Sequence, residues 1–223
     1  MTEPSAHVDT FCADNLPPRE LWPVMNYDSL PDLAYPARLN CAAELLDWAV
    51  EAGNGDSAVF HYEGHNWSYA DLLATANRIA HVLVEDLSVV PGNRVLLRAA
   101  NTPMLAACWF AVLKVGGVVV STMPLLRPRE IRYTADKARI WLALTDSRVA
   151  ADCERGMLAD SEGTPRAGAR VVQFNTDSTD GLEAMMRDKP ATFRNCDVSA
   201  EDIALIAFTS GTTGRAKGTM HTH

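Results

Sequence analysis

The sequence predicts an α/β protein whose mostly parallel sheet is flanked by helices on both faces. Short apolar runs rich in Val, Ile and Leu alternate with amphipathic stretches of helical length from residue 94 onward. The stretches between the runs have the length of βαβ crossovers, which make successive strands parallel. A small hairpin is expected before this alternation, around the turn Glu63-Gly64-His65.

Composition limits the class of protein. The chain has 223 residues, 48% of them hydrophobic and 22% charged, which is typical of a soluble globular protein with a sizeable core. Its net charge of -8 argues against a nucleic-acid binder, which normally has a basic face. The five cysteines are widely spread and form no C-x-x-C pair, so neither a zinc site nor a disulfide framework is predicted. Reduced thiols in a cytoplasmic protein are the expectation.

Neither a signal peptide nor a membrane span is predicted. Residues 1–18 are polar and lack the basic start and apolar core of a signal peptide. Residues 103–124 are long and apolar, but Lys114 and Gly116-Gly117 divide them into a helix and a strand.

The chain divides into three predicted parts. Residues 1–39 are rich in Pro, Asp and Asn and form an N-terminal arm that packs on the body. Residues 40–190 form an α/β subdomain. Residues 191–223 supply a connector, a strand and a loop that open the next subdomain, so that residues 203–208 are expected to begin a second sheet.

Local signals place the helices. Apolar residues at helical spacing predict a helix over residues 40–52. Ser68 and Asp71 form an S-x-x-D capping box, so the next helix begins after Ser68 and runs to about residue 87. Thr102 caps a third helix, with Pro103 at its first position, where a missing N–H costs nothing. Further helices are expected at residues 128–138, 147–159 and 179–187, and strands at residues 58–62, 66–69, 94–98, 118–122, 140–144, 170–174 and 203–208.

The most informative stretch follows the last predicted strand. There the apolar run 203–208 gives way to hydroxyls and glycines, and a lysine follows. Glycines can bring backbone N–H groups close to an anion, hydroxyls add donors, and the lysine adds a positive charge. A loop at the end of a buried strand lies where α/β proteins bind ligands. The candidate phosphate-binding residues are Thr209, Ser210, Gly211, Thr212, Thr213, Gly214, Lys217 and Gly218.

Spacing excludes two other phosphate loops. A Walker loop needs Gly-Lys-Ser/Thr, whereas Ala216 precedes Lys217 and Gly218 follows it. A dinucleotide fingerprint needs G-x-G-x-x-G, which these glycines do not match. The plain alternative is a Gly/Thr-rich surface loop with a solvated lysine.

Residues 209–218 resemble the phosphate-loop signature of the adenylate-forming superfamily, roughly [ST]-S-G-T-T-G-x-x-K-G. This superfamily contains acyl- and aryl-CoA synthetases, luciferases and the adenylation domains of peptide synthetases. Every defined position matches, and Ala216 stands where a proline is common. Residues 67–72 and 113–124 are similar to two upstream family elements, T-Y-x-E-L and an L-K-x-G stretch that ends in proline. The finer resemblance, to benzoate- and 2-aminobenzoate-CoA ligases, rests on residues 15–18, 35–40 and 123–127.

The resemblance implies a two-step reaction on a small carboxylic acid. The carboxylate attacks the α-phosphate of Mg-ATP, giving an acyl-adenylate and pyrophosphate, and the thiol of coenzyme A then displaces AMP. ATP, Mg²⁺ and coenzyme A are therefore the implied cofactors and co-substrate. The glycines of the motif would let the loop wrap around the β- and γ-phosphates, which would be held by Ser210, Thr212, Thr213 and Lys217.

The resemblance also implies that the chain is the N-terminal part of a longer enzyme. The family's adenine-contacting segment, ribose-binding acid, hinge and C-terminal lysine have no counterpart here, so no catalytic residue is assigned. Little or no ligase activity is expected from this part alone. The family's N-terminal region has two similar α/β layers, of which this chain would contain the second only in part. The incomplete layer would expose apolar surface, so self-association is expected.

Other interpretations stay open. One is a fatty-acyl-AMP ligase or a carrier-protein-loading adenylation enzyme, and another is a non-catalytic nucleotide-binding module. His221 and His223 would share a face if they lay on a strand, which makes them a possible metal pair. A structural role is favoured for both because no third ligand is near, and no metal site is predicted.

Overall fold

The computed structural model describes residues 4–24, 26, 29–30, 35–160, 162–209 and 215–223. Within them, six strands form one sheet in the order β6-β5-β3-β4-β7-β8. Neighbouring strands from β6 to β7 are parallel, and β8 is antiparallel to β7. The predicted class, an α/β fold with a mostly parallel sheet, is confirmed. The strands are β3 (Arg94–Arg98), β4 (Val118–Thr122), β5 (Leu142–Asp146), β6 (Arg170–Phe174), β7 (Ile203–Thr209) and β8 (Lys217–Thr222).

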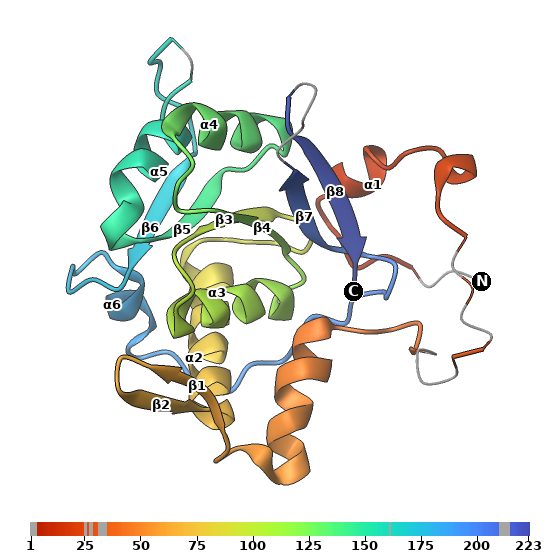
Figure 1. The fold of residues 1–223 in the computed structure, drawn as a ribbon, viewed down its shortest axis with the longest axis vertical. Helices are drawn as coiled ribbons and strands as arrows, with labels where there is room; N and C mark the ends of the chain where they lie inside the picture. Colours follow the sequence, from red (N-terminus) through yellow and green to blue (C-terminus); the bar gives the residue numbers. More distant parts are fainter. Residues whose placement is uncertain (1–3, 25, 27–28, 31–34, 161, 210–214) are drawn as a thin grey trace.

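Helices cover both faces of this sheet (Figure 1). The helices α2 (Tyr69–His81) and α3 (Pro103–Lys114) pack on one face, and α4 (Pro128–Lys137) and α5 (Ala150–Met157) pack on the other. Successive strand side chains alternate between the faces. In β3, Val95 and Leu97 join the α2–α3 core, whereas Leu96 joins the α4–α5 core. Strands buried on both faces explain the continuous apolar runs in the sequence.

The segment before the sheet also folds as predicted. The strands β1 (Ala58–Tyr62) and β2 (His65–Ser68) form an antiparallel hairpin. The helix predicted over residues 40–52 is largely π-helical, in η3 (Ala43–Asp47) and η4 (Val50–Asn54). A further π-helical turn, η5 (Val82–Asp86), continues α2.

The predicted helix caps are present. Asp71 N donates to Ser68 Oγ at 3.1 Å, and Ser68 N donates to the Asp71 carboxylate at 3.0 Å. Leu105 N donates to Thr102 Oγ1 at 3.2 Å, with Pro103 in the first turn of α3. Both helix starts were therefore readable from local sequence.

Some boundaries differ from the prediction. The strand β5 starts at Leu142 rather than at residue 140 and runs to Asp146, whose carboxylate then accepts a hydrogen bond from Arg148 N. This cap makes a short 3₁₀ turn, η6 (Ser147–Val149), before α5. The helix α6 (Leu182–Met186) is shorter than the predicted range 179–187.

The last predicted strand does not begin a second sheet, so that expectation is wrong. The strand β7 runs parallel to β4, with Val119 opposite Leu205, and extends the sheet of β3 to β6. Backbone pairing explains this, because β7 uses the free hydrogen-bonding edge of β4. The strand β8, which was not predicted, continues the sheet beyond β7. The division of the chain at residues 39 and 190 stays a prediction.

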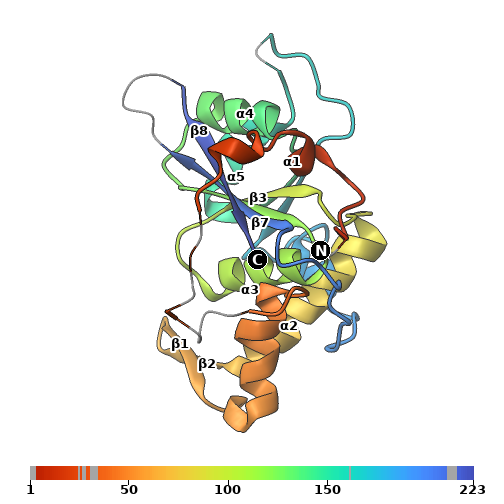
Figure 2. The same ribbon diagram turned by 90° about the vertical axis from the view of Figure 1, so that its right-hand side faces the viewer.

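The N-terminal arm is attached to the body by specific contacts. It contains two short helices, α1 (Phe11–Asp14) and η1 (Arg19–Leu21). The Asp9 carboxylate pairs with Arg94 Nη1 at 2.6 Å, and Cys12 is fully buried in the α4–α5 core. Figure 2 shows α1 beside α4.

No helix in the described part of the chain is long and apolar enough to cross a membrane. The apolar stretch 103–124 forms α3 and β4, as predicted.

Candidate phosphate-binding site

The candidate site lies on the hairpin of β7 and β8, at the carboxyl edge of the parallel strands. The strand β7 ends at Thr209, on the edge where the parallel strands β3 and β4 also end. Thr209 pairs with Lys217 across the hairpin, and Thr209 Oγ1 donates to the Lys217 carbonyl oxygen at 3.4 Å. Open α/β sheets bind ligands at this edge, so the connection from β7 to β8 is where a ligand is expected.

The structure places three of the eight candidate residues. Thr209 and Lys217 are exposed at the base of the hairpin, and Gly218 follows in β8. The other five lie outside the described residues, and their phosphate contacts stay a prediction. They are Ser210, Gly211, Thr212, Thr213 and Gly214.

The base of the hairpin carries positive charge although the chain is acidic. Arg215 and Lys217 are exposed and form no ion pair with any residue that the structure describes. Together with Lys137 of α4, they line a groove of about 340 Å³, to which Phe208 also contributes. An anion that approaches this edge therefore meets cations that are not already neutralised.

Gly218 has a packing role that the motif did not reveal. A Cβ at this position would lie 2.9 Å from Ile206 Cγ2 and 3.4 Å from the Phe208 ring. Gly218 pairs with Phe208 within the β7–β8 ladder. Glycine is therefore needed because β8 passes close to the side chains of β7, in addition to the loop-wrapping role inferred from the motif.

Replacing Gly218 with Ala is expected to lower the free energy of unfolding by about 1–3 kcal/mol, because Ile206 is buried and must shift to make room. Urea denaturation measures the change. Gly55→Ala is the matched control, since a Cβ there meets only ordinary contacts, the nearest at 3.5 Å. Equal stability of the two variants would contradict the packing role.

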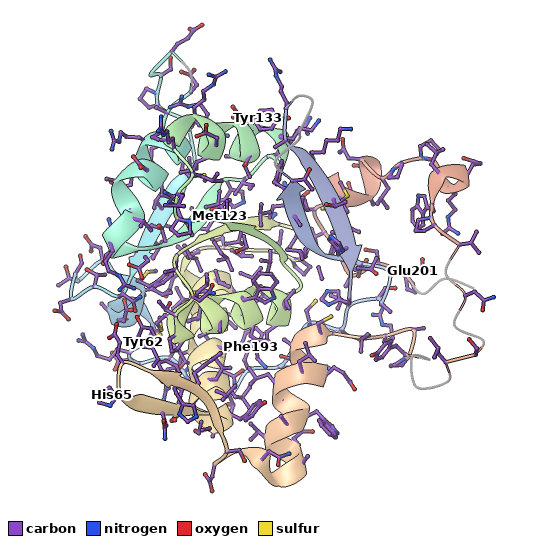
Figure 3. The ribbon with its side chains drawn as sticks, viewed as in Figure 1. Tyr62, His65, Met123, Tyr133, Phe193 and Glu201 are labelled. Atoms are coloured by element: carbon purple, nitrogen blue, oxygen red, sulfur yellow. The ribbon has the colours of Figure 1, made fainter. Side chains whose placement is uncertain are left out.

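Tyr133 of α4 also reaches this hairpin (Figure 3). Its hydroxyl donates to the Ala216 carbonyl oxygen at 2.9 Å, across 83 positions of sequence. Sequence reasoning missed both Tyr133 and Lys137, since no local pattern links α4 to a loop so far along the chain.

The two C-terminal histidines do not form a metal pair. His221 is exposed on β8, whereas His223 lies beyond the end of the strand and is mostly buried. His223 Nδ1 accepts a hydrogen bond from Cys41 N at 3.2 Å, and burial lowers the pKa of His223 to about 4. Among the residues that the structure describes, no group of three His, Cys, Asp or Glu could hold a metal ion.

The burial of His223 predicts a pH-dependent stability. Its pKa is about 4 in the folded chain, against an ordinary value of 6.5, so the unfolded chain takes up the proton first as the pH falls. The contribution of the neutral, buried His223 to stability is complete above pH 6.5 and is lost progressively as the pH falls toward 4.

Urea midpoints at about pH 7.5 and about pH 5 measure this loss. His223→Gln is expected to reduce the difference between the two midpoints, and His221→Gln, at the exposed position, to leave it unchanged. Burial also lowers the pKa of His7, so both variants retain part of the dependence of stability on pH. If the two midpoints differ by the same amount in the wild type and in the His223 variant, the pH dependence does not come from His223.

A larger groove, of about 590 Å³, lies between β1 and the start of α3. Aromatic side chains such as Phe60, Tyr62 and Trp109 line it. None of the described candidate phosphate-binding residues lines this groove, so it is a separate feature.

Comparison with known proteins identifies the family of the chain. A sequence model of the family described as AMP-binding enzyme matches residues 46–223, a range that includes the whole candidate loop. The chain belongs to the AMP-binding enzyme family. The inferred resemblance to adenylate-forming enzymes is confirmed.

The relatives that the chain matches include two CoA ligases. A 3-hydroxybenzoate–CoA ligase of Aromatoleum sp. (strain CIB) is 28% identical over 189 residues, which cover 83% of this chain and 35% of that protein. An uncharacterized acyl–CoA ligase of Bacillus subtilis (strain 168), YtcI, is 27% identical over 195 residues, covering 86% of this chain and 35% of that protein. The chain thus spans about a third of the length of each of these two relatives.

Solved structures share the fold. The anthranilate CoA ligase AuaEII, in complex with anthranoyl-AMP, superposes with a TM-score of 0.75 at 20% identity, covering 89% of this chain and 36% of that one. ATP-bound MatB from Rhodopseudomonas palustris gives a TM-score of 0.67 at 27% identity, covering 82% of this chain and 34% of that one. The adenylate-forming fold is confirmed for this chain.

Proposed function

We propose that this chain is the ATP-phosphate-binding part of an AMP-forming carboxylate–CoA ligase that acts on an aryl acid such as benzoate or 2-aminobenzoate. One observation carries the proposal. The T-S-G-T-T-G-x-x-K-G stretch joins β7 to β8 at the carboxyl edge of a parallel sheet, in a chain of the AMP-binding enzyme family.

The proposed chemistry needs no nucleophile from this chain. The carboxylate oxygen of the substrate attacks the α-phosphorus of ATP, a new P–O bond forms, and the bond to the β-phosphate oxygen breaks to release pyrophosphate. The sulfur of coenzyme A then attacks the acyl carbon, and AMP leaves. The task of the phosphate loop is to hold the leaving pyrophosphate and offset its negative charge.

Lys217 is the described residue best suited to that task. It is exposed at the base of the loop and forms no ion pair with a described residue, so its ammonium is free to meet a phosphate. Thr209 adds a hydroxyl at the opposite side of the hairpin base. Mg²⁺ would be held mainly by the phosphates of ATP, as is usual for this ion.

Carboxylate-dependent ATP–pyrophosphate exchange tests the proposal. The protein to assay is the full enzyme that contains this chain, beside the 223-residue chain alone. Exchange with benzoate or 2-aminobenzoate is expected from the full enzyme, and little or none from the chain alone. A folded full enzyme that exchanges only with fatty acids would overturn the aryl-acid assignment, and exchange with no acid would overturn the adenylation assignment.

A second candidate is an adenylation enzyme that loads a carrier protein. Surfactin synthase subunit 1 of Bacillus subtilis (strain 168) is 29% identical over 192 residues, covering 86% of this chain and 4% of that protein. This identity is no lower than the 27% and 28% of the two CoA ligases described above. The acceptor separates the two candidates. Acyl transfer to coenzyme A supports the ligase, and transfer only to a carrier-protein thiol supports the second candidate.

Self-association and a cytoplasmic location remain part of the proposal. The strand β8 is an edge strand of the described sheet, and such edges can pair with another chain. This gives self-association a physical route.

A further inference from the structure

We propose that Tyr133 is a positioning residue for Lys217, acting by fixing the peptide group that precedes the lysine. This inference rests on the phosphate-binding role proposed above. Tyr133 Oη donates to the Ala216 carbonyl oxygen at 2.9 Å and so joins α4 to the end of the loop that leads into β8.

The helix that carries Tyr133 is a firm support. Arg132 donates from Nε to the Ala159 carbonyl oxygen and from Nη2 to the Arg155 carbonyl oxygen, each at 2.8 Å, and so ties α4 to α5 and the residues that follow it. A Cβ on Gly156 of α5 would lie 2.7 Å from Ile131, so the two helices are in close contact. The position of the Tyr133 hydroxyl is therefore set by the packed body and not by the hairpin.

The hydrogen bond acts directly on the backbone of the lysine. The carbonyl group of Ala216 and the N–H group of Lys217 belong to one planar peptide unit, so holding the oxygen limits rotation of the whole unit. On its other side, Lys217 is held by its pairing with Thr209. Two restraints from different elements thus set the direction in which the lysine side chain leaves the backbone.

This arrangement matters for binding because the lysine side chain itself is unrestrained. It is exposed and pairs with no described carboxylate, so orientation must come from the backbone. A cation whose backbone is already oriented loses less conformational entropy when it meets a phosphate. Removing the Tyr133 hydroxyl should therefore weaken nucleotide binding without removing any group that touches the nucleotide.

A second bond in the same hairpin separates positioning from general stability. Thr219 Oγ1 donates to the Ala207 carbonyl oxygen at 2.9 Å, with the same donor and acceptor types and the same length as the Tyr133 bond. It lies within the ladder of β7 and β8, away from the peptide that precedes Lys217. Thr219→Val is therefore the matched control for Tyr133→Phe.

The experiment compares the wild-type chain, Tyr133→Phe and Thr219→Val. Calorimetric titration gives the Kd for MgATP, and amide hydrogen exchange without nucleotide reports on residues 215–218. Tyr133→Phe is expected to raise the Kd about fivefold, the effect of one hydrogen bond of ordinary net strength. It is also expected to speed exchange at residues 215–218. Thr219→Val is expected to change the Kd by less than about twofold.

The outcomes separate this inference from the proposed function. A wild-type chain that binds no MgATP overturns the proposed function, and hydrogen exchange then still tests the contact, since unchanged exchange in Tyr133→Phe overturns the positioning role. Wild-type binding with an unchanged Kd in Tyr133→Phe overturns the positioning role alone. An equal loss of affinity in Thr219→Val also overturns it, because both bonds would then serve only the hairpin.

Discussion

Replacing Asp47 with Asn is expected to lower the free energy of unfolding by about 3 kcal/mol. Lys114 is fully buried, and its Nζ donates to both oxygens of the Asp47 carboxylate, at 2.7 Å and 2.6 Å. Burial already holds the pKa of Lys114 below its usual value, and the carboxylate opposes that effect. Asn keeps the shape of the side chain but leaves the buried ammonium without its counter-charge.

An exposed pair provides the control for this prediction. Arg155 and Asp152 pair at 2.8 Å with both side chains largely in solvent, so Asp152→Asn is expected to change stability by less than about 1 kcal/mol. Replacing both Asp47 and Lys114 with apolar residues of similar size is expected to recover much of the loss. Urea denaturation measures all three. Equal losses for the two Asp variants would show that the buried pair is not a stabilising contact.

Replacing Lys217 with Ala is expected to weaken MgATP binding roughly ten- to a hundredfold, the effect of losing a charge-assisted hydrogen bond of about 1.5–3 kcal/mol. The side chain is exposed at the base of the candidate loop, so its removal leaves the core intact. An unchanged melting temperature with a raised Kd is the expected combination. Calorimetric titration with MgATP measures the Kd.

Lys137→Ala is the control for local charge. Lys137 lines the same groove but lies on α4, outside the motif. If Lys217 contacts a phosphate, Lys137→Ala should raise the Kd by less than about threefold, as expected for a screened, longer-range attraction. Equal effects of the two variants would mean that general positive potential, and not a specific contact, attracts the nucleotide.

Much of the fold could be predicted because its signals are local. The apolar strands buried on both faces, the Ser68–Asp71 capping box and the Thr102-Pro103 helix start each depend on a few neighbouring residues. Lys114 was predicted as a break in an apolar stretch and as part of the L-K-x-G element, without a partner. Its partner Asp47 lies 67 positions away, and a contact of that range leaves no local pattern.

Strand pairing was the part of the fold that the sequence could not determine. The sequence pattern of an apolar strand such as residues 203–208 is the same whether the strand extends an existing sheet or begins another. The edge of β4 with which it pairs is formed only in the folded chain. The strand β8 contains few apolar residues, so its sequence lacks the alternation of apolar and polar residues that predicts a strand. Its strand conformation depends on pairing with β7.

The candidate site was predictable where its signal is local and not where it depends on contacts between distant residues. The loop motif is contiguous in sequence, and Thr209, Lys217 and Gly218 lie together at the hairpin base. The space restriction at Gly218 depends on Ile206 and Phe208, and the Tyr133 contact depends on the packing of α4. Neither follows from spacing alone.

The most direct test of the central claim compares MgATP with AMP as ligands of this 223-residue chain. If the β7–β8 hairpin holds the β- and γ-phosphates, MgATP should bind measurably and pyrophosphate should compete with it. AMP, which lacks those phosphates, should bind at least about tenfold more weakly. AMP binding as tight as MgATP binding, with no competition by pyrophosphate, would contradict the assignment of this hairpin as the phosphate site.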